Sequence, residues 1–127
     1  MNINDIKTVK VPNGCLLKEL FMQAQEEMAD YGTVFPVDLN TGEGQKLFRE
    51  FAAYTVEELM EGVNALKNRP WNQSQVLVDI QHVKEELSDA LHFFIALCNL
   101  IGLSHVELFE IYMKKKQVNN FRRESGY

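Results

Sequence analysis

The sequence predicts an all-α fold in which four main helices form an antiparallel bundle, within a single domain that spans residues 1–127. Over four long segments, apolar residues recur at the three- and four-residue spacing of one helix face. Glycine, proline and asparagine separate these segments. Beyond a β-branched arm at the N-terminus, no segment alternates apolar and polar residues as a half-buried strand does.

The composition argues against several classes of protein. The 127 residues are 46% hydrophobic and 24% charged, which is typical of a globular domain with one core. A formal net charge of -5 argues against a general nucleic-acid-binding surface. The chain shows neither an apolar secretory segment at its N-terminus nor an apolar run of the ~20 residues that cross a membrane. We therefore expect a cytoplasmic protein that binds neither nucleic acid nor membranes, with Cys15 and Cys98 as reduced core thiols.

The first part of the chain is expected to hold an arm, one helix and a loop. Residues 1–13 form the arm, which ends in a turn. Helical spacing of apolar residues predicts the first helix over about 15–31, and Gly32 is its expected C-terminal stop. Proline, aspartate, asparagine and glycine are frequent over 33–44, which is typical of a loop.

The two middle helices are expected to be long. The second runs over about 45–67, and Pro70 prevents it from continuing. The third runs over about 74–101, with Ser74 as its N-terminal cap and Gly102 as its stop.

Both middle helices carry two apolar faces. The longer stripe of each helix is expected to form the core, and the second set of the third helix to lie at a central position or a subunit interface. In the third helix the longer stripe comprises Val76, Ile80, Val83, Leu87, Ala90, Leu91, Phe94, Cys98 and Ile101. Its second set comprises Phe93, Ala96, Leu97 and Leu100. In the second helix the core stripe comprises Phe48, Ala52, Val56, Leu59, Val63 and Leu66. This pattern predicts a homo-oligomer, either a dimer or a tetramer.

Two acidic pairs lie beside the second apolar faces. Glu58 and Glu61 are three residues apart on the second helix, and Glu86 and Asp89 are three apart on the third. This spacing puts each pair on one helix face. Carboxylates beside apolar surface are costly to desolvate unless a cation compensates their charge. Four oxygen ligands favour Mg²⁺, or Mn²⁺, over Zn²⁺.

A fourth helix is expected to open at a capping box formed by Ser104 and Glu107. Because its link to the third helix is short, the two helices are expected to form an antiparallel hairpin. If this helix continues, Lys115, Asn119 and Arg122 share one face and can bind phosphate. The alternative is a basic helix end that compensates the helix dipole, and at this point both interpretations stay open.

The single tryptophan and two of the histidines also need an interpretation. Trp71 either anchors a loop or forms an aromatic wall for a nucleotide base. His82 and His105 are interpreted as exposed or capping residues.

Three stretches of the chain together resemble the all-α nucleoside triphosphate pyrophosphohydrolases, the superfamily of the MazG proteins, the dimeric dUTPases and the phosphoribosyl-ATP pyrophosphatases. The stretches are 57–71, 85–94 and 112–127. The chain is most similar to the dimeric dUTPase branch, and in particular to its phage-encoded members. The C-terminal pattern that carries this similarity is Lys115-x-x-x-Asn119-x-x-Arg122-x-x-x-Gly126-Tyr127.

The resemblance implies Mg²⁺-dependent hydrolysis of a (d)NTP to the monophosphate and pyrophosphate, with dUTP as the first expected substrate. It implies that Mg²⁺ is bound by Glu58, Glu61, Glu86 and Asp89. It implies that the substrate is contacted by Trp71, Lys115, Asn119, Arg122 and Tyr127. Glu58 is the carboxylate expected to orient or deprotonate the attacking water.

The base specificity and the enzymatic role each have an alternative. The dimeric dUTPase branch reads uracil partly through glutamine and asparagine near its N-terminal helix, so the resemblance makes Gln23 and Gln25 candidates for reading the base. A dCTP-preferring or broad MazG-like housecleaning activity is the enzymatic alternative to dUTP hydrolysis. A helical dimerisation or binding module without catalysis is the alternative from another class.

Overall fold

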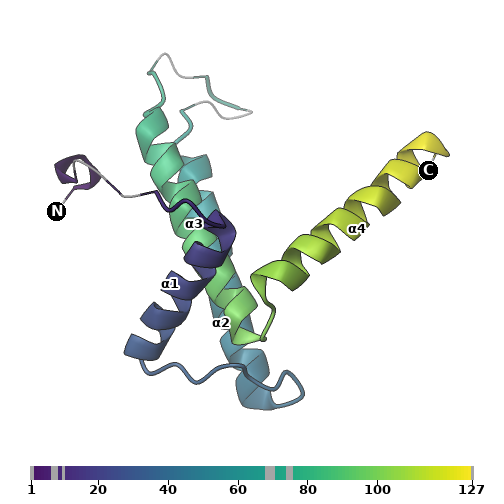
Figure 1. Ribbon diagram of the computed structural model, residues 1–127. Coiled ribbons are helices and arrows are strands. Elements are labelled where there is room, and N and C mark those ends of the chain that lie inside the picture. Colours follow the sequence, from purple (N-terminus) through teal and green to yellow (C-terminus); the bar gives the residue numbers. More distant parts are fainter. Residues whose placement is uncertain (1, 7–8, 10, 68–70, 74–75, 127) are drawn as a thin grey trace.

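The computed structural model describes residues 2–6, 9, 11–67, 71–73 and 76–126. A short 3-10 helix at Ile3–Asp5 precedes four α-helices (Figure 1). Their bounds are Leu16–Asp30 for α1, Gly42–Asn64 for α2, Ile80–Leu100 for α3 and His105–Glu124 for α4. No strand occurs within these ranges, so the predicted all-α fold is confirmed. The N-terminal arm contains the 3-10 helix.

Several helix ends follow the capping residues that the sequence predicts. Gly32 and Gly102, with φ of 74° and 75°, adopt the left-handed conformation just beyond α1 and α3. Ser104 caps α4, because its Oγ accepts a hydrogen bond from the backbone N–H of Glu107 at 3.1 Å.

The N-terminal ends of α2 and α3 differ from the predicted ones. Helix α2 begins at Gly42, because Thr41 caps it by accepting the N–H of Gly44. Gly44 lies so close to Asp38 that a Cβ atom would collide with the Asp38 carbonyl. Helix α3 begins at Ile80 with Asp79 as its cap, so the predicted start near residue 74 is wrong. Ser74 itself lies outside the described residues.

Helices α2 and α3 pack along each other as an antiparallel pair, and α1 lies against α3 (Figure 1). Helix α4 leaves this group at a bend of 104° from α3 and, among the described helices, packs only against α1. The predicted α3–α4 hairpin is therefore wrong, and the described chain does not close a four-helix antiparallel bundle by itself. No single described helix is long and apolar enough to cross a membrane; α3 and α4 pass that test only when taken together as a bent pair.

A small core joins α1 to α3. Phe21, Ile95 and Cys98 are buried in it, and burial raises the pKa of the Cys98 thiol. The buried Asn99 donates to the Phe21 carbonyl at 3.2 Å and accepts from the Gln25 amide at 3.3 Å, so both helices are joined by polar contacts as well. The prediction of a second core thiol is wrong, because Cys15 precedes α1 at the surface.

The apolar stripes expected to form the core lie largely at the surface. The internal contacts run instead through the second face of α3, where Phe93, Ala96 and Leu97 are half-buried and Leu100 is fully buried. Turned at 100° per residue, the exposed stripes of α2 and α3 fall on the same side of the contact between the two helices. Together with the exposed Met60 beside them, we call their exposed residues the outer apolar face, which comprises Val56, Leu59, Met60, Val63, Leu66, Ile80, Leu87, Leu91 and Phe94. The placement of Ile80, Leu87, Leu91 and Phe94 in the core is therefore wrong within one chain.

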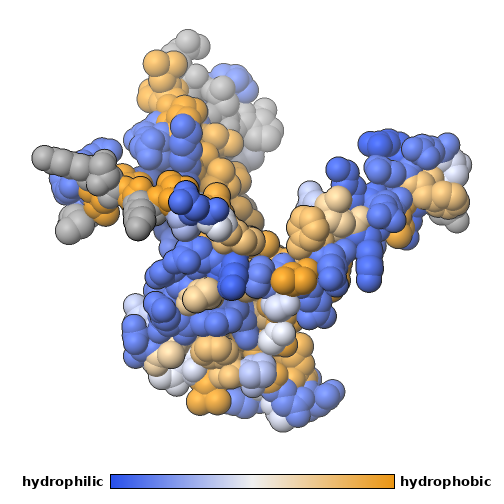
Figure 2. Space-filling model, viewed as in Figure 1, coloured by the Kyte–Doolittle hydropathy of each residue, from blue (hydrophilic) through white to orange (hydrophobic). Residues whose placement is uncertain are grey.

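The accessible surface is large for a chain of this mass. The chain exposes 10176 Å², whereas a compact monomer of 14.7 kDa exposes about 6,900 Å². Figure 2 shows hydrophobic side chains reaching this surface both along the α2–α3 pair and on α4. One chain alone therefore leaves unburied much apolar surface that a stable fold ordinarily covers.

Candidate metal centre

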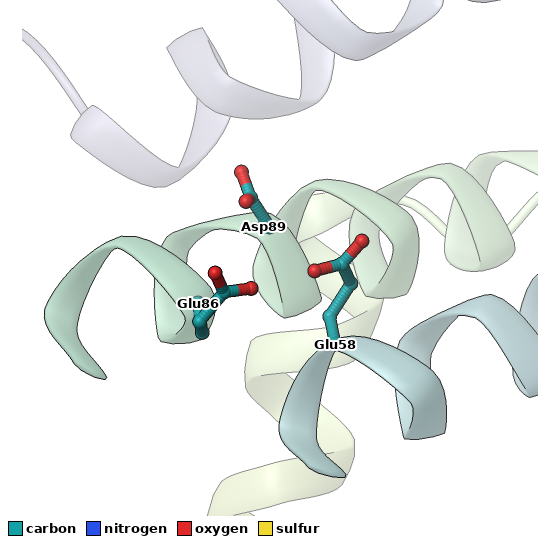
Figure 3. A group of neighbouring side chains, drawn as sticks. All are labelled: Glu58, Glu86 and Asp89. Carbon is teal, nitrogen blue, oxygen red and sulfur yellow. The ribbon is translucent and has the colours of Figure 1, made fainter. Parts of the chain in front are cut away.

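Three of the four predicted carboxylates meet between α2 and α3 (Figure 3). Glu58 projects from α2 toward Glu86 and Asp89 of α3, and one oxygen from each of the three lies within 4.8 Å of the others. We call these residues the acidic triad. Glu61 is not part of it but adjoins it: a hydrogen bond with Glu86, followed by the repulsion of that carboxylate, raises the pKa of Glu61.

The acidic triad exists because α2 and α3 approach each other closely at Gly62. This glycine is buried, and a Cβ atom added to it would lie 3.5 Å from the Cβ of Glu86. The absence of a side chain at this position leaves room for Glu86 between the helices, where the residue is only 7% exposed. The i, i+3 spacing then puts Asp89 one turn further along the same face of α3.

The Glu86 carboxylate is held unequally at its two oxygens. Its Oε1 lies 3.6 Å from His82 Nε2, whereas its Oε2 is buried and has no hydrogen-bond partner. A buried charged oxygen without a donor is unfavourable by roughly 1–3 kcal/mol or more. The site therefore favours an occupant that supplies positive charge, either a cation or a proton, and the all-oxygen donor set of the triad fits Mg²⁺ or Mn²⁺.

The raised pKa of Glu58 shows that the acidic triad favours a bound proton. A hydrogen bond with Glu86, together with desolvation and the charges of Glu61 and Asp89, raises the pKa of Glu58 to about 7. The proton gives the Glu86 carboxylate a hydrogen-bond donor, which two ionised carboxylates cannot provide to each other. A cation bound by the triad would supply positive charge to the same oxygens, so the proton and the cation compete.

Cation binding to the metal-free protein is therefore expected to release a proton from Glu58. Release should approach one proton per Mn²⁺ near pH 6 and vanish by pH 8, because the pKa of Glu58 is about 7. Calorimetric titrations in buffers of different ionisation enthalpy measure the number of protons released.

Without metal, the free energy of unfolding should fall as the pH rises from 4.5, the pKa of Glu58 in the unfolded chain, toward 7. The reason is that the folded state binds the Glu58 proton more tightly than the unfolded state does. The neighbouring variant Glu57→Gln should behave as the wild type, and proton release independent of pH would contradict this assignment.

A cavity of about 900 Å³ opens beside the triad, between α1, α2 and α3. Its volume falls within the range of small-molecule sites. Glu58 and Asp89 line it, and so do three acidic residues of α1: Glu26, Glu27 and Asp30. No described lysine or arginine lines it. A polyphosphate could therefore bind here only with cations, or with basic groups from elsewhere.

Aromatic rings line the α2–α3 side of this cavity. Phe51 and Phe93 both contribute to its wall. Tyr54 links them, with ring centroids 6.2 Å from Phe51 and 5.3 Å from Phe93. Such a cluster offers flat apolar surface for a nucleoside next to the charged triad.

The two glutamine candidates for base recognition differ in availability. Gln23 lines the cavity, and its amide donates to Glu19 at 2.9 Å, which leaves its carbonyl oxygen available. Gln25 is instead occupied by the buried Asn99. Of the two candidates, only Gln23 is placed to meet a ligand.

The other predicted substrate contacts are not brought to the triad. Lys115, Asn119 and Arg122 are exposed on α4, which packs against neither α2 nor α3. Trp71 is 82% exposed and does not line the cavity. Tyr127 lies outside the described residues.

His82 is the site residue that the sequence interpretation missed. The expectation that His82 is exposed is confirmed, since its side chain is 47% exposed. It also precedes Glu86 and Asp89 by four and seven residues. That spacing puts all three on one face of α3 and was the available signal.

Comparison of the chain with protein-family models, with curated proteins and with solved structures found no match.

Proposed function

We propose that the protein is a Mg²⁺-dependent nucleoside triphosphate pyrophosphohydrolase of the all-α type, for which Mn²⁺ can replace Mg²⁺. The observation that carries this proposal is the buried, unpartnered Oε2 of Glu86 within the acidic triad, at the edge of a cavity of about 900 Å³. The resemblance of the acidic pairs to that superfamily supports the same activity.

The proposed reaction cleaves the bond between the α-phosphorus and the oxygen that bridges it to the β-phosphorus. Glu58 orients a water molecule and accepts its proton. The water oxygen bonds to the α-phosphorus, and pyrophosphate leaves with the bridging oxygen. Glu86 and Asp89 would hold Mg²⁺ with Glu58, and the ion would stabilise charge on the phosphate oxygens.

We propose dUTP as the preferred substrate. This preference derives from the resemblance to the dimeric dUTPase branch. The free carbonyl oxygen of Gln23 supports it, because uracil presents an N–H donor on its pairing edge and cytosine presents an acceptor at the same position. Phe51 and Phe93 would pack against the nucleoside.

We further propose that two copies of the chain pair through the outer apolar face. Its nine apolar side chains form one surface across two helices, and the chain exposes roughly 3,000 Å² more than a compact monomer would. Two α2–α3 pairs packed face to face would form a four-helix bundle from two chains, which differs from the bundle predicted for the four helices of one chain. A second copy would also supply what the cavity lacks, namely the basic residues Lys115 and Arg122 of α4.

The activity is tested by incubating the protein with each dNTP and Mg²⁺ and then separating the products. We expect dUTP to give dUMP and pyrophosphate, and EDTA to abolish turnover because the triad needs a cation. Fastest turnover of dCTP, or equal turnover of all dNTPs, would replace the proposed specificity with the MazG-like alternative. No turnover of any nucleotide would overturn the proposed activity in favour of a helical binding module.

A further inference from the structure

The two oxygens of the Glu86 carboxylate have different surroundings. Oε1 faces His82 Nε2 at 3.6 Å. Oε2 is buried without a partner, on a residue whose other neighbours in the triad are carboxylates. Oε2 is therefore the oxygen available to a cation, whereas Oε1 already contacts the imidazole of His82.

The contact between His82 and Glu86 differs from an ordinary surface ion pair because one of its two side chains is buried. Exposed pairs at i, i+4 on a helix contribute little, because water screens them and both side chains stay mobile. The Glu86 side chain is only 10% exposed, whereas the His82 side chain is 47% exposed. The imidazole therefore reaches from the solvent edge of α3 to a carboxylate that water barely contacts.

A partner on one oxygen restricts the orientation of a ligating carboxylate. The terminal torsion of glutamate is broad, so a neighbour on Oε1 helps to fix which oxygen of Glu86 faces Glu58 and Asp89. Metal-ligating side chains are generally held by such outer contacts, and removing one typically lowers metal affinity about 10- to 100-fold.

We propose that His82 is a positioning residue that holds Oε1 of Glu86 and thereby presents Oε2 to a divalent cation. This inference rests on the metal centre of the proposed function. It adds to that centre a residue that binds no substrate and acts only through Glu86.

The test is the affinity of the intact chain for Mn²⁺, measured by titration calorimetry without nucleotide. His82→Leu removes the nitrogen and is expected to weaken Mn²⁺ binding about 10- to 100-fold. His82→Gln returns an N–H donor at a similar reach and is expected to restore the affinity to within about threefold of the wild type. Gln81→Leu is the matched control, because it makes the neighbouring residue apolar on another face of α3 and should change nothing. Circular dichroism shows whether each variant keeps its helix content.

Two results would overturn the role of His82. His82→Leu could bind Mn²⁺ as the wild type does, or His82→Gln could bind as weakly as His82→Leu, which would indicate direct ligation by the imidazole. Glu86→Gln in the same titration separates this inference from the proposed function. If Glu86→Gln loses Mn²⁺ binding and His82→Leu does not, only the positioning role fails. If Glu86→Gln binds as the wild type does, the metal centre fails and the positioning role fails with it.

Discussion

Replacing Glu86 by glutamine is expected to lower kcat about a thousandfold or more, because it removes a charged ligand from a site that stabilises the transition state by several kcal/mol. Glutamine has nearly the same shape, so the close packing over Gly62 and the helix content should persist. Steady-state kinetics with Mg²⁺ and circular dichroism measure the two effects. Without metal, the variant should be as stable as the wild type or more stable, since it ends the repulsion with Glu58 and Asp89.

The matched control for this variant is Glu85→Gln. It makes the same chemical change on the adjacent residue of α3, which lies outside the acidic triad. Its kcat should stay within a few-fold of the wild type, as expected for a charge without a role in the centre. Wild-type turnover by Glu86→Gln would show that the acidic triad is not the catalytic centre.

Replacing Leu87 by glutamate is expected to prevent formation of the proposed homodimer and, with it, the proposed turnover. The side chain is 55% exposed in the middle of the outer apolar face, so a charge there costs the single chain little but would be desolvated in a dimer. Sedimentation equilibrium should give twice 14.7 kDa for the wild type and 14.7 kDa for the variant. Activity should fall because the cavity of an isolated chain is lined by no described lysine or arginine.

Two comparisons make this second prediction specific. Gln81→Glu adds the same charge to another face of α3 and should leave the dimer intact. Mixing Glu86→Gln with Arg122→Ala tests whether α4 acts on the other copy. At low substrate concentration each variant alone should be slow, whereas a mixed dimer would contain one site with an intact triad and an intact partner Arg122. A wild type that sediments as a monomer would contradict the dimer, and an absence of recovery on mixing would contradict action across it.

Helix positions and several caps could be predicted from the sequence because they depend on neighbouring residues. Gly32, Gly102 and Ser104 act locally, through backbone conformation or a hydrogen bond within one turn. The direction of α4 could not be predicted in this way, because packing between distant residues sets it. Residue spacing likewise revealed both apolar faces of α3 but not which face the chain buries internally. The stripe with Leu87 and Leu91 is the stronger one, yet it stays exposed.

The acidic triad was predictable to a similar degree. The i, i+3 spacing correctly placed Glu86 and Asp89 on one face of α3, and the packing of α2 against α3 brings Glu58 opposite them. It could not show that Glu61 would stand outside the triad. It also could not show that Glu86 would be buried, because that burial depends on the close approach of α2 at Gly62.

The acidic wall of the cavity has a consequence for the order of binding. Five carboxylates and no described lysine or arginine line it, so a bare triphosphate entering it meets charge of its own sign. A nucleotide whose charge is partly neutralised by chelated Mg²⁺ meets a lower electrostatic barrier. The species that enters should therefore be the magnesium–nucleotide complex, and initial rates at varied Mg²⁺ should follow its concentration rather than that of free nucleotide. The acidic wall would then admit nucleotides that carry Mg²⁺ before any contact with the base distinguishes one nucleotide from another.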